Sequence, residues 1–186
     1  LGTYLIKLSS NQVSEQDSAE AAKLLKMIGD FERISDHAVN ILESAEEMNS
    51  KDLKFSESAM KELGVLTDAV EEILDLALKA FLDEDVEAAS KVEPLEEVID
   101  GLKEQMRTRH ILRLQQGDCS IDAGFVWSDL LTNLERTADH CSNIAVCVLD
   151  AGSDMNIHES LHEMKAYNDD FKAEFEKYAA KYSIAK

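Results

Sequence analysis

Two groups of oxygen-bearing side chains recur in this sequence at a spacing that could hold a metal ion. Glu32, Asp36 and Asn40 stand four residues apart. On an α-helix each such step turns only about 40°, so the three side chains share one face. The same residue types return at the same spacing as Glu135, Asp139 and Asn143. Oxygen ligands placed in this way can bind a hard or borderline cation when a facing helix adds further carboxylates.

The two groups belong to an internal repeat with a constant offset of 103 residues. FERISDHAVNI at 31–41 and LERTADHCSNI at 134–144 are identical at six of eleven positions, five of them polar. The identical pairs are Glu32/Glu135, Arg33/Arg136, Asp36/Asp139, His37/His140, Asn40/Asn143 and Ile41/Ile144. A duplicated helix needs only its apolar stripe to keep packing. Agreement at polar positions therefore indicates a further role.

The segment before the second copy carries carboxylates that could complete a site. Glu96 and Asp100 repeat the Glu-x-x-x-Asp spacing, and Glu93, Glu97 and Glu104 lie near them in the sequence. A short connection makes sequential helices antiparallel neighbours. We therefore expect Glu96 and Asp100 to lie opposite the acid pair of the second copy.

The repeated acids also have a structural interpretation. Glu32 with Arg33, and Glu135 with Arg136, could form ion pairs between helices. Carboxylates four residues apart are common in a chain with 38 acids, so one such pair carries little information. Two copies in register, each followed by His and Asn, favour metal binding over ion pairing.

The histidines leave several roles open. His37 and His140 follow the Asp of each copy, about 100° around the helix from it. They are candidates for ligands, for donors that orient a ligating carboxylate, or for surface residues, and we favour the last two. Neither copy has the Glu-x-x-His of ferritin-like di-iron proteins, which disfavours oxygen-activating chemistry. HESLH at 158–162 matches the zinc-protease pattern, but no third ligand is evident, so we interpret the match as chance.

Composition narrows the partners and the compartment. The 186 residues include 38 acids and 19 bases, a net charge of −19, which disfavours binding to nucleic acid or anionic lipid. Three cysteines without a Cys-x-x-Cys spacing fit a reducing cytosol. No apolar stretch approaches the roughly 20 residues of a membrane span. We predict a cytoplasmic location, at the inner face of the plasma membrane if a membrane portion precedes Leu1.

Apolar residues at helical spacing predict an all-α fold of up-and-down antiparallel helical bundles. One stripe comprises Leu24, Ile28, Phe31, Ile34, Ala38, Ile41 and Leu42, and another comprises Met60, Leu63, Leu66, Val70, Ile73, Leu74 and Ala77. Ser14 and Ser56 precede these stripes as N-caps. Phe31, Phe125 and Trp127 are expected in the core, with Cys141 and Cys147 buried. The expected helices are 2–10, 15–49, 56–82, 85–116, 122–150 and 157–182.

The repeated motif resembles that of a known family. DFERISDHAVNI at 30–41 and NLERTADHCSNI at 133–144 are similar to the Glu-Arg-x-x-Asp-His-x-x-Asn signature of the PhoU family of phosphate-transport regulators. Supporting segments are TYLIKLSS at 3–10, LEEVIDGL at 95–102 and RHILRLQQGDCS at 109–120. The resemblance covers about residues 3–150. It is strongest to the PhoU-like domain at the C-terminal end of bacterial sodium/phosphate symporters.

The resemblance implies two pseudo-symmetric three-helix units. These would be a partial first unit at 1–52, a complete second unit at 53–150 and a C-terminal helix at 151–186. The helix that should face the first acid pair would lie mostly before Leu1. Pro94 lacks a backbone N–H, so it should kink the 85–116 helix or start it afresh, and it could displace Glu96.

The resemblance also implies a cofactor and a site. The family's multinuclear iron or zinc would lie on acidic faces of adjacent helices, and a divalent or trivalent metal is the expected cofactor. By position, the ligands would be Glu32 and Asp36 in the first unit, and Glu96, Asp100, Glu135 and Asp139 in the second. The second set is better supported because its facing helix is present.

Three functional hypotheses follow. The leading one is a regulatory, non-enzymatic, metal-binding domain that controls phosphate uptake by contacting a phosphate transporter or the membrane domain of its own symporter, with a homodimer possible. The second is a metal-free structural or chaperone-like bundle whose motifs set helix register. A metallohydrolase or oxidase is least supported, because no general base, nucleophile or oxyanion device accompanies the carboxylates.

Overall fold

The computed structural model describes residues 2–3, 14–149 and 169–184, and helices are the regular elements of that part of the chain. They are α2 (Glu15–Ser50), α3 (Glu57–Asp83), α4 (Val86–Gln116), α5 (Ile121–Leu149) and α7 (Asp169–Lys181). The predicted all-α fold is confirmed. The expected helices at 15–49, 56–82, 85–116 and 122–150 agree with α2 to α5 to within one residue at each end. Most of the expected helix at 2–10, the first half of that at 157–182 and the HESLH run lie outside the described residues.

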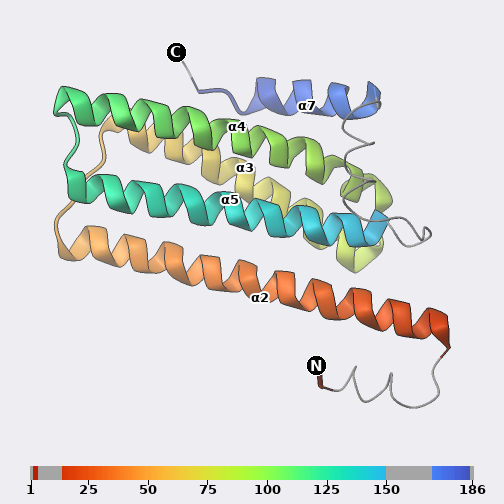
Figure 1. Ribbon diagram of the computed structural model, residues 1–186. Helices are drawn as coiled ribbons and strands as arrows, with labels where there is room; N and C mark the ends of the chain where they lie inside the picture. Colours follow the sequence, from red (N-terminus) through yellow and green to blue (C-terminus); the bar gives the residue numbers. More distant parts are fainter. Residues whose placement is uncertain (1, 4–13, 150–168, 185–186) are drawn as a thin grey trace.

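Helix α5 lies in the middle of the assembly. It packs against α2 on one side and against α3 and α4 on the other, while α7 packs on the outer side of α4 (Figure 1). Successive helices run antiparallel, as the short connections require (Figure 1). The central helix must therefore present three different surfaces to its neighbours.

Polar side chains define where the helices begin. The Ser14 hydroxyl accepts from the backbone N–H of Asp17 at 3.1 Å, and the Ser56 hydroxyl accepts from that of Ala59 at 3.2 Å. Both predicted N-caps are thus confirmed. Each cap satisfies a backbone donor that the first turn of a helix leaves unpaired.

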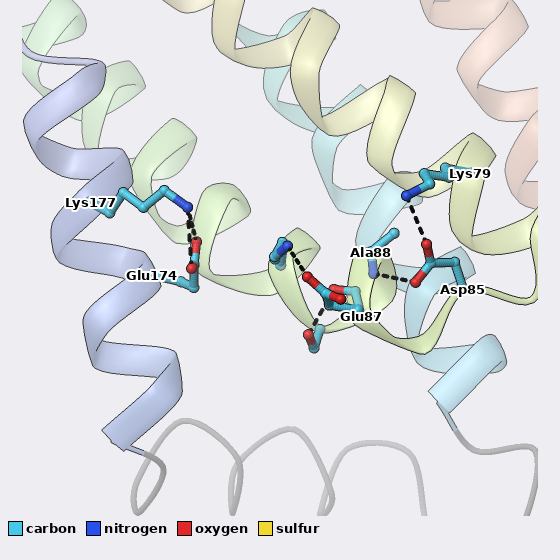
Figure 2. A network of polar contacts seen from close by, with 8 residues as sticks. Lys79, Asp85, Glu87, Ala88, Glu174 and Lys177 are labelled. Atoms are coloured by element: carbon cyan, nitrogen blue, oxygen red, sulfur yellow. Dashed lines mark hydrogen bonds and ion pairs between the residues drawn. The ribbon is translucent and has the colours of Figure 1, made fainter.

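A third cap links α3 to α4. One carboxylate oxygen of Asp85 accepts from the Ala88 backbone N–H at 3.0 Å, and the other lies 2.8 Å from Lys79 Nζ on α3 (Figure 2). The Lys79 ammonium, followed by the Ala88 N–H, holds the pKa of Asp85 below its ordinary value. The Asp85 side chain therefore caps the N-terminus of α4 and links α4 to the end of α3 through an ion pair.

The main core lies among α3, α4 and α5. Leu66, Ile73, Leu95 and Ile99 are fully buried there. Cys141 and Cys147 are buried as expected, and burial raises the pKa of Cys141 to about 12, so its thiol is inert at neutral pH. A large apolar core of this kind supplies most of the stability of a helical domain.

Buried charges at one end of this core are paired. Glu62 accepts from Arg113 Nη1 at 2.9 Å and from Arg109 Nη1 at 3.1 Å, and the Arg113 guanidinium lies 5.3 Å from the centroid of the Trp127 ring. Two guanidinium groups thus compensate one buried carboxylate. Trp127 is 1% exposed, in agreement with its predicted core position.

Several residues expected in the core are exposed instead. Ala38 and Leu42 lie on the side of α2 that faces away from α5, and none of the described helices covers that side. Met60, near the first turn of α3, is 52% exposed. Phe125 is 67% exposed because it lies on the same face of α5 as the polar Ser128. The predicted apolar stripes have the correct helical period, but they include residues that none of the described helices covers.

Pro94 lies within α4, which continues unbroken from Val86 to Gln116. The expectation that Pro94 restarts the helix is therefore wrong. The ribbon of α4 changes direction close to its beginning (Figure 1), in keeping with the expected kink. Glu96 is not displaced from the face that Asp139 also borders, since both line one cavity.

Gly124 allows α5 to approach α4 closely. A Cβ at this position would lie 2.8 Å from His110 Nε2, and the His110 ring has little room to move because it is buried and stacked on Trp127. We predict that Gly124→Ala lowers the free energy of unfolding by about 1–3 kcal/mol, as overpacking does. Urea denaturation measures this change.

Gly64→Ala is the matched control. A Cβ at Gly64 meets nothing within 4 Å, so this substitution should raise the free energy of unfolding by about 0.5–1 kcal/mol. If Gly124→Ala stabilised the protein as much as Gly64→Ala does, the close contact with His110 would not exist in solution.

Candidate metal centre

The two copies of the repeat meet where α2 crosses α5. Asp30, directly before the first copy, accepts at its Oδ1 from His140 Nδ1 at 2.9 Å and from Asn143 Nδ2 at 3.3 Å. Asp30 is 8% exposed, so its charge is compensated mainly by these two side chains of the second copy.

The reciprocal contact is made by the other half of the repeat. Asn133, directly before the second copy, accepts at its Oδ1 from His37 Nδ1 at 2.8 Å and from Asn40 Nδ2 at 3.0 Å. The rings of His37 and His140 stack between the two halves, with centroids 5.6 Å apart and planes inclined by 24°. The repeated His and Asn thus form a pseudo-two-fold interface.

This interface changes the interpretation of the repeat. The amide nitrogens of Asn40 and Asn143 donate across the α2 and α5 interface, which leaves their side-chain oxygens, the atoms that a cation would need, outside these hydrogen bonds. His37 and His140 orient polar groups across the same interface. The repeated His and Asn are therefore accounted for by the contact between α2 and α5, and the repeated acids are not part of that contact.

The acids of the second copy face α4 as expected. We call Glu96 and Asp100 of α4, together with Glu135 and Asp139 of α5, the acidic seam. Burial, followed by the nearby charge of Glu135, raises the pKa of Asp100. Burial, then Glu135, then Asp100, raises the pKa of Asp139. These carboxylates lie close enough to repel one another, which is the arrangement that the sequence predicted.

A cavity of about 250 Å³ opens at one end of the seam. It is lined by Glu96 and Asp139 together with Glu93, Ser142 and Asn143. The Ser142 hydroxyl donates to the buried Glu93 carboxylate, which fixes that carboxylate at the cavity wall. The cavity provides carboxylate oxygens and a polar space large enough for a hydrated cation.

Lys103 compensates part of the negative charge. Its Nζ lies 2.8 Å from Glu135 Oε1, and both side chains are largely buried. Within the described ranges, no three His, Cys, Asp or Glu side chains already stand in a metal-binding cluster. The acids of the seam are therefore gathered but not yet converged on one point.

The acids of the first copy are placed differently. Glu32 and Asp36 are exposed on α2, away from the seam. Within the described residues, neither belongs to a group of three or more potential metal ligands. The structure thus unites four of the six predicted ligands and leaves these two apart.

Sequence reasoning missed several residues of the site. Asp30 and Asn133 differ between the copies, so identity between the copies could not reveal them, although they occupy equivalent positions. Lys103 follows Asp100 by three residues, so it lies on the seam face of α4. That spacing was the available signal for Lys103.

The PhoU domain matches residues 2–45 and 64–148, which include both copies of the repeat. The chain belongs to the PhoU family. The PhoU resemblance of the sequence motifs is thereby confirmed. Each matched range contains one copy of the repeat, and the two copies contact each other between α2 and α5.

Related proteins carry names connected with phosphate transport. The PhoU chain is 29% identical over 143 residues to phosphate-specific transport system accessory protein PhoU homolog 1 of Thermotoga maritima, covering 77% of this chain and 61% of that protein. It is 26% identical over 149 residues to YjbB of Salmonella typhimurium, whose name proposes inorganic phosphate export, covering 79% and 27%.

The chain thus spans less than two thirds of the length of these relatives. No solved structure matches it significantly. None of the described helices is both long and apolar enough to cross a membrane.

Asp30 and Asn133 occupy equivalent positions but differ in charge, so their removal should affect stability differently. Asp30→Ala removes a charged acceptor of two hydrogen bonds and should lower the free energy of unfolding by about 1.5–3 kcal/mol. Asn133→Ala, its counterpart, removes a neutral acceptor and should cost about 0.5–1.5 kcal/mol. Chemical denaturation measures both. Equal losses would show that the Asp30 charge adds nothing to the contact between α2 and α5.

Proposed function

We propose that this chain is a regulatory, non-enzymatic domain of a phosphate-transport system, and that its acidic seam binds a divalent or trivalent metal ion. Iron and zinc are the first candidates. Membership of the PhoU family supports the connection with phosphate transport. The acidic seam supports the metal site.

The observation that carries the metal proposal is the placement of Glu96 and Asp139 at one cavity, with Asp100 and Glu135 close to Asp139. Burial, followed by the nearby carboxylates, raises the pKa values of Asp100 and Asp139, so the ionised forms of these two groups are less favourable in the folded chain than in water. A bound cation would neutralise the carboxylates of the seam and be coordinated by their oxygens.

The same residues suggest how a cation would be held. Glu96 and Asp139 border one cavity, and Asp100 and Glu135 adjoin it along the seam. Glu135 would exchange its ion pair with Lys103 for the metal. Metal binding is therefore expected to rearrange the seam rather than fill a finished cage.

The partner proposal rests on the relatives. The Thermotoga maritima protein is named as an accessory of a phosphate-specific transport system, and YjbB is named for phosphate export. We propose that this domain contacts a phosphate transporter, or a membrane domain of its own chain, at the cytoplasmic face of the membrane. Co-purification with the transporter of the source organism tests this contact.

A metal-free structural role is the second candidate. The reciprocal contacts of His37, His140, Asn40 and Asn143 favour it, because they show that part of the repeat sets the register of two helices. The acid pairs would then be remnants of the duplication. Metal analysis separates the two proposals.

Metal should stabilise the folded chain. A ligand that binds only the native state raises Tm by mass action. We expect chelator-treated protein to gain Tm when iron, zinc or manganese is added, and Glu135→Gln and Asp139→Asn to lose this response together with stoichiometric metal measured by elemental analysis. Asp129→Asn, on an exposed position of the same helix, is the control and should respond like the wild type. No metal and no shift in Tm would leave the structural proposal.

The acidic seam should also destabilise the metal-free protein near neutral pH. The pKa of Asp139 is raised above its ordinary value of 3.8, so the folded state binds this proton more tightly than the unfolded state. As the pH rises from 3.8 through the raised pKa, stability is lost, and the loss persists at pH 7. Asp139→Asn should therefore raise the Tm of metal-free protein at pH 7, by about 2–4 °C for each kcal/mol recovered.

The pH dependence gives the control for this prediction. Near pH 3 the Asp139 carboxyl is protonated in both states, so Asp139→Asn should change Tm little there. Thermal unfolding followed by circular dichroism at both pH values measures the difference. If Asp139→Asn were less stable than the wild type at pH 7, the ionised Asp139 carboxylate would not destabilise the folded chain, and the prediction would be wrong.

A further inference from the structure

A second cavity, of about 510 Å³, lies between α4 and α5 on the other side of Lys103 from the carboxylate cavity. We call it the basic cavity. Lys103 and Arg107 of α4 and Ser128 and Thr132 of α5 provide its polar lining, and Ile111 is among its apolar residues. None of these residues belongs to the proposed metal ligands.

The charge of the basic cavity is opposite to that of the molecule. The chain carries twice as many acids as bases, and the lining of this cavity contains two cations and no Asp or Glu. Opposite charge focused in a hollow attracts anions from solution even when the net charge repels them.

Arg107 can direct its donors to an anion. Its side chain is 69% exposed, and its Nη1 lies 3.8 Å from Glu104 Oε1. That distance is longer than the roughly 2.7–2.9 Å of a charge-assisted hydrogen bond. Its guanidinium can therefore turn to a ligand without breaking a strong contact. Lys103 keeps two further N–H groups beyond the one directed at Glu135.

The opposite wall is formed by α5. The Ser128 hydroxyl is available as a donor, whereas the Thr132 hydroxyl donates to the Ser128 backbone carbonyl at 2.8 Å and can only accept. An oxyanion would therefore meet Arg107 and Lys103 from α4 and Ser128 from α5. Donors that converge from two helices make a site more specific than a patch of lysines on one surface.

Two buried rings form the inner wall. His110 and Trp127 are 8% and 1% exposed, and they stack with centroids 6.0 Å apart. His110 Nε2 and Trp127 Nε1 are buried without a hydrogen-bond partner in the described part of the chain. His110 Nε2 lies against Gly124, and neither nitrogen is accessible from the cavity, so the two rings give this wall an aromatic surface and no hydrogen-bond donors.

We propose that the basic cavity binds a phosphoryl group, held by Arg107, Lys103 and Ser128. The ligand is inorganic phosphate or a phosphate monoester, which share this chemistry. The cavity is larger than inorganic phosphate requires, and Ile111 gives it an apolar side against which the organic part of a monoester packs. This binding requires no metal, so the two proposals are tested separately, although Lys103 also forms an ion pair with Glu135 of the seam.

The protein contains a natural fluorescent probe of this cavity. Trp127 is the one tryptophan of the sequence and it lines the cavity, so its fluorescence is specific to the site. We would titrate the full chain with inorganic phosphate and with phenyl phosphate, exciting the indole at low ionic strength. A chelator in the buffer prevents bound metal from supplying the phosphate site.

Both ligands are expected to change the Trp127 fluorescence saturably, and phenyl phosphate is expected to bind more tightly than inorganic phosphate. Arg107→Gln should weaken both affinities about tenfold or more, since a hydrogen bond to a charged group is lost. Arg33→Gln, an exposed position on α2 that removes the same charge, should leave them unchanged. An unaltered circular dichroism spectrum and Tm would show that Arg107→Gln remains folded.

Two results would overturn the proposal. One is the absence of saturable binding by either ligand. The other is equal affinity in Arg107→Gln and Arg33→Gln, which would reduce the effect to net charge. Binding of inorganic phosphate and phenyl phosphate with the same affinity would place the organic part in solvent and contradict the role of Ile111.

Discussion

Helix α5 must satisfy three neighbours at once, and the rest of the structure depends on how it does so. Toward α2 it presents His140 and Asn143, which need polar partners in a partly buried setting. Toward α3 it presents apolar side chains that fill the core. Toward α4 it presents Glu135 and Asp139. Because these surfaces lie on one helix, a rotation that improved one contact would spoil the other two.

The polar network and the apolar core therefore have different tasks. Burial of Leu66, Ile73 and Ile99 stabilises the folded chain. The hydrophobic effect is not directional, so this burial does little to fix the rotation of one helix against another. The hydrogen bonds of Asp30 and Asn133 fix which turn of α2 meets which turn of α5. With the rotation of α5 set in this way, its acids have to face α4. The contact that fixes the rotation of α5 against α2 therefore also brings the carboxylates of α5 against α4.

Along that second interface the chain separates charge by sign. The acidic seam and the basic cavity lie on the same side of α4 and α5, and Lys103 lies between them with its ammonium on Glu135. A cation on the seam would compete with Lys103 for Glu135, and a released Lys103 could turn toward the cavity. The two sites share a residue, although neither requires the other.

Much of this could be predicted from the sequence. The periodicity located the described helices closely, and Ser14 and Ser56 marked two beginnings because capping is a local interaction. The seam followed from helical spacing and antiparallel order. The exposure of Leu42 and Phe125 could not be read from the sequence, because a stripe records which residues are apolar and not which neighbour covers them. The roles of His37 and Asn40 depend on Asn133, which is distant in sequence and differs from its counterpart in the other copy.

That difference, an aspartate before one copy and an asparagine before the other, has a consequence for how the fold could arise. Two separate chains of a single copy, paired about a true axis, would have to place identical side chains on both sides, either two buried acids or two amides. Joining the copies in one polypeptide removes this constraint, since each half can then change alone. A chain that carries both copies can therefore place one carboxylate, Asp30, opposite one amide, Asn133, which a symmetric dimer of a single copy cannot do.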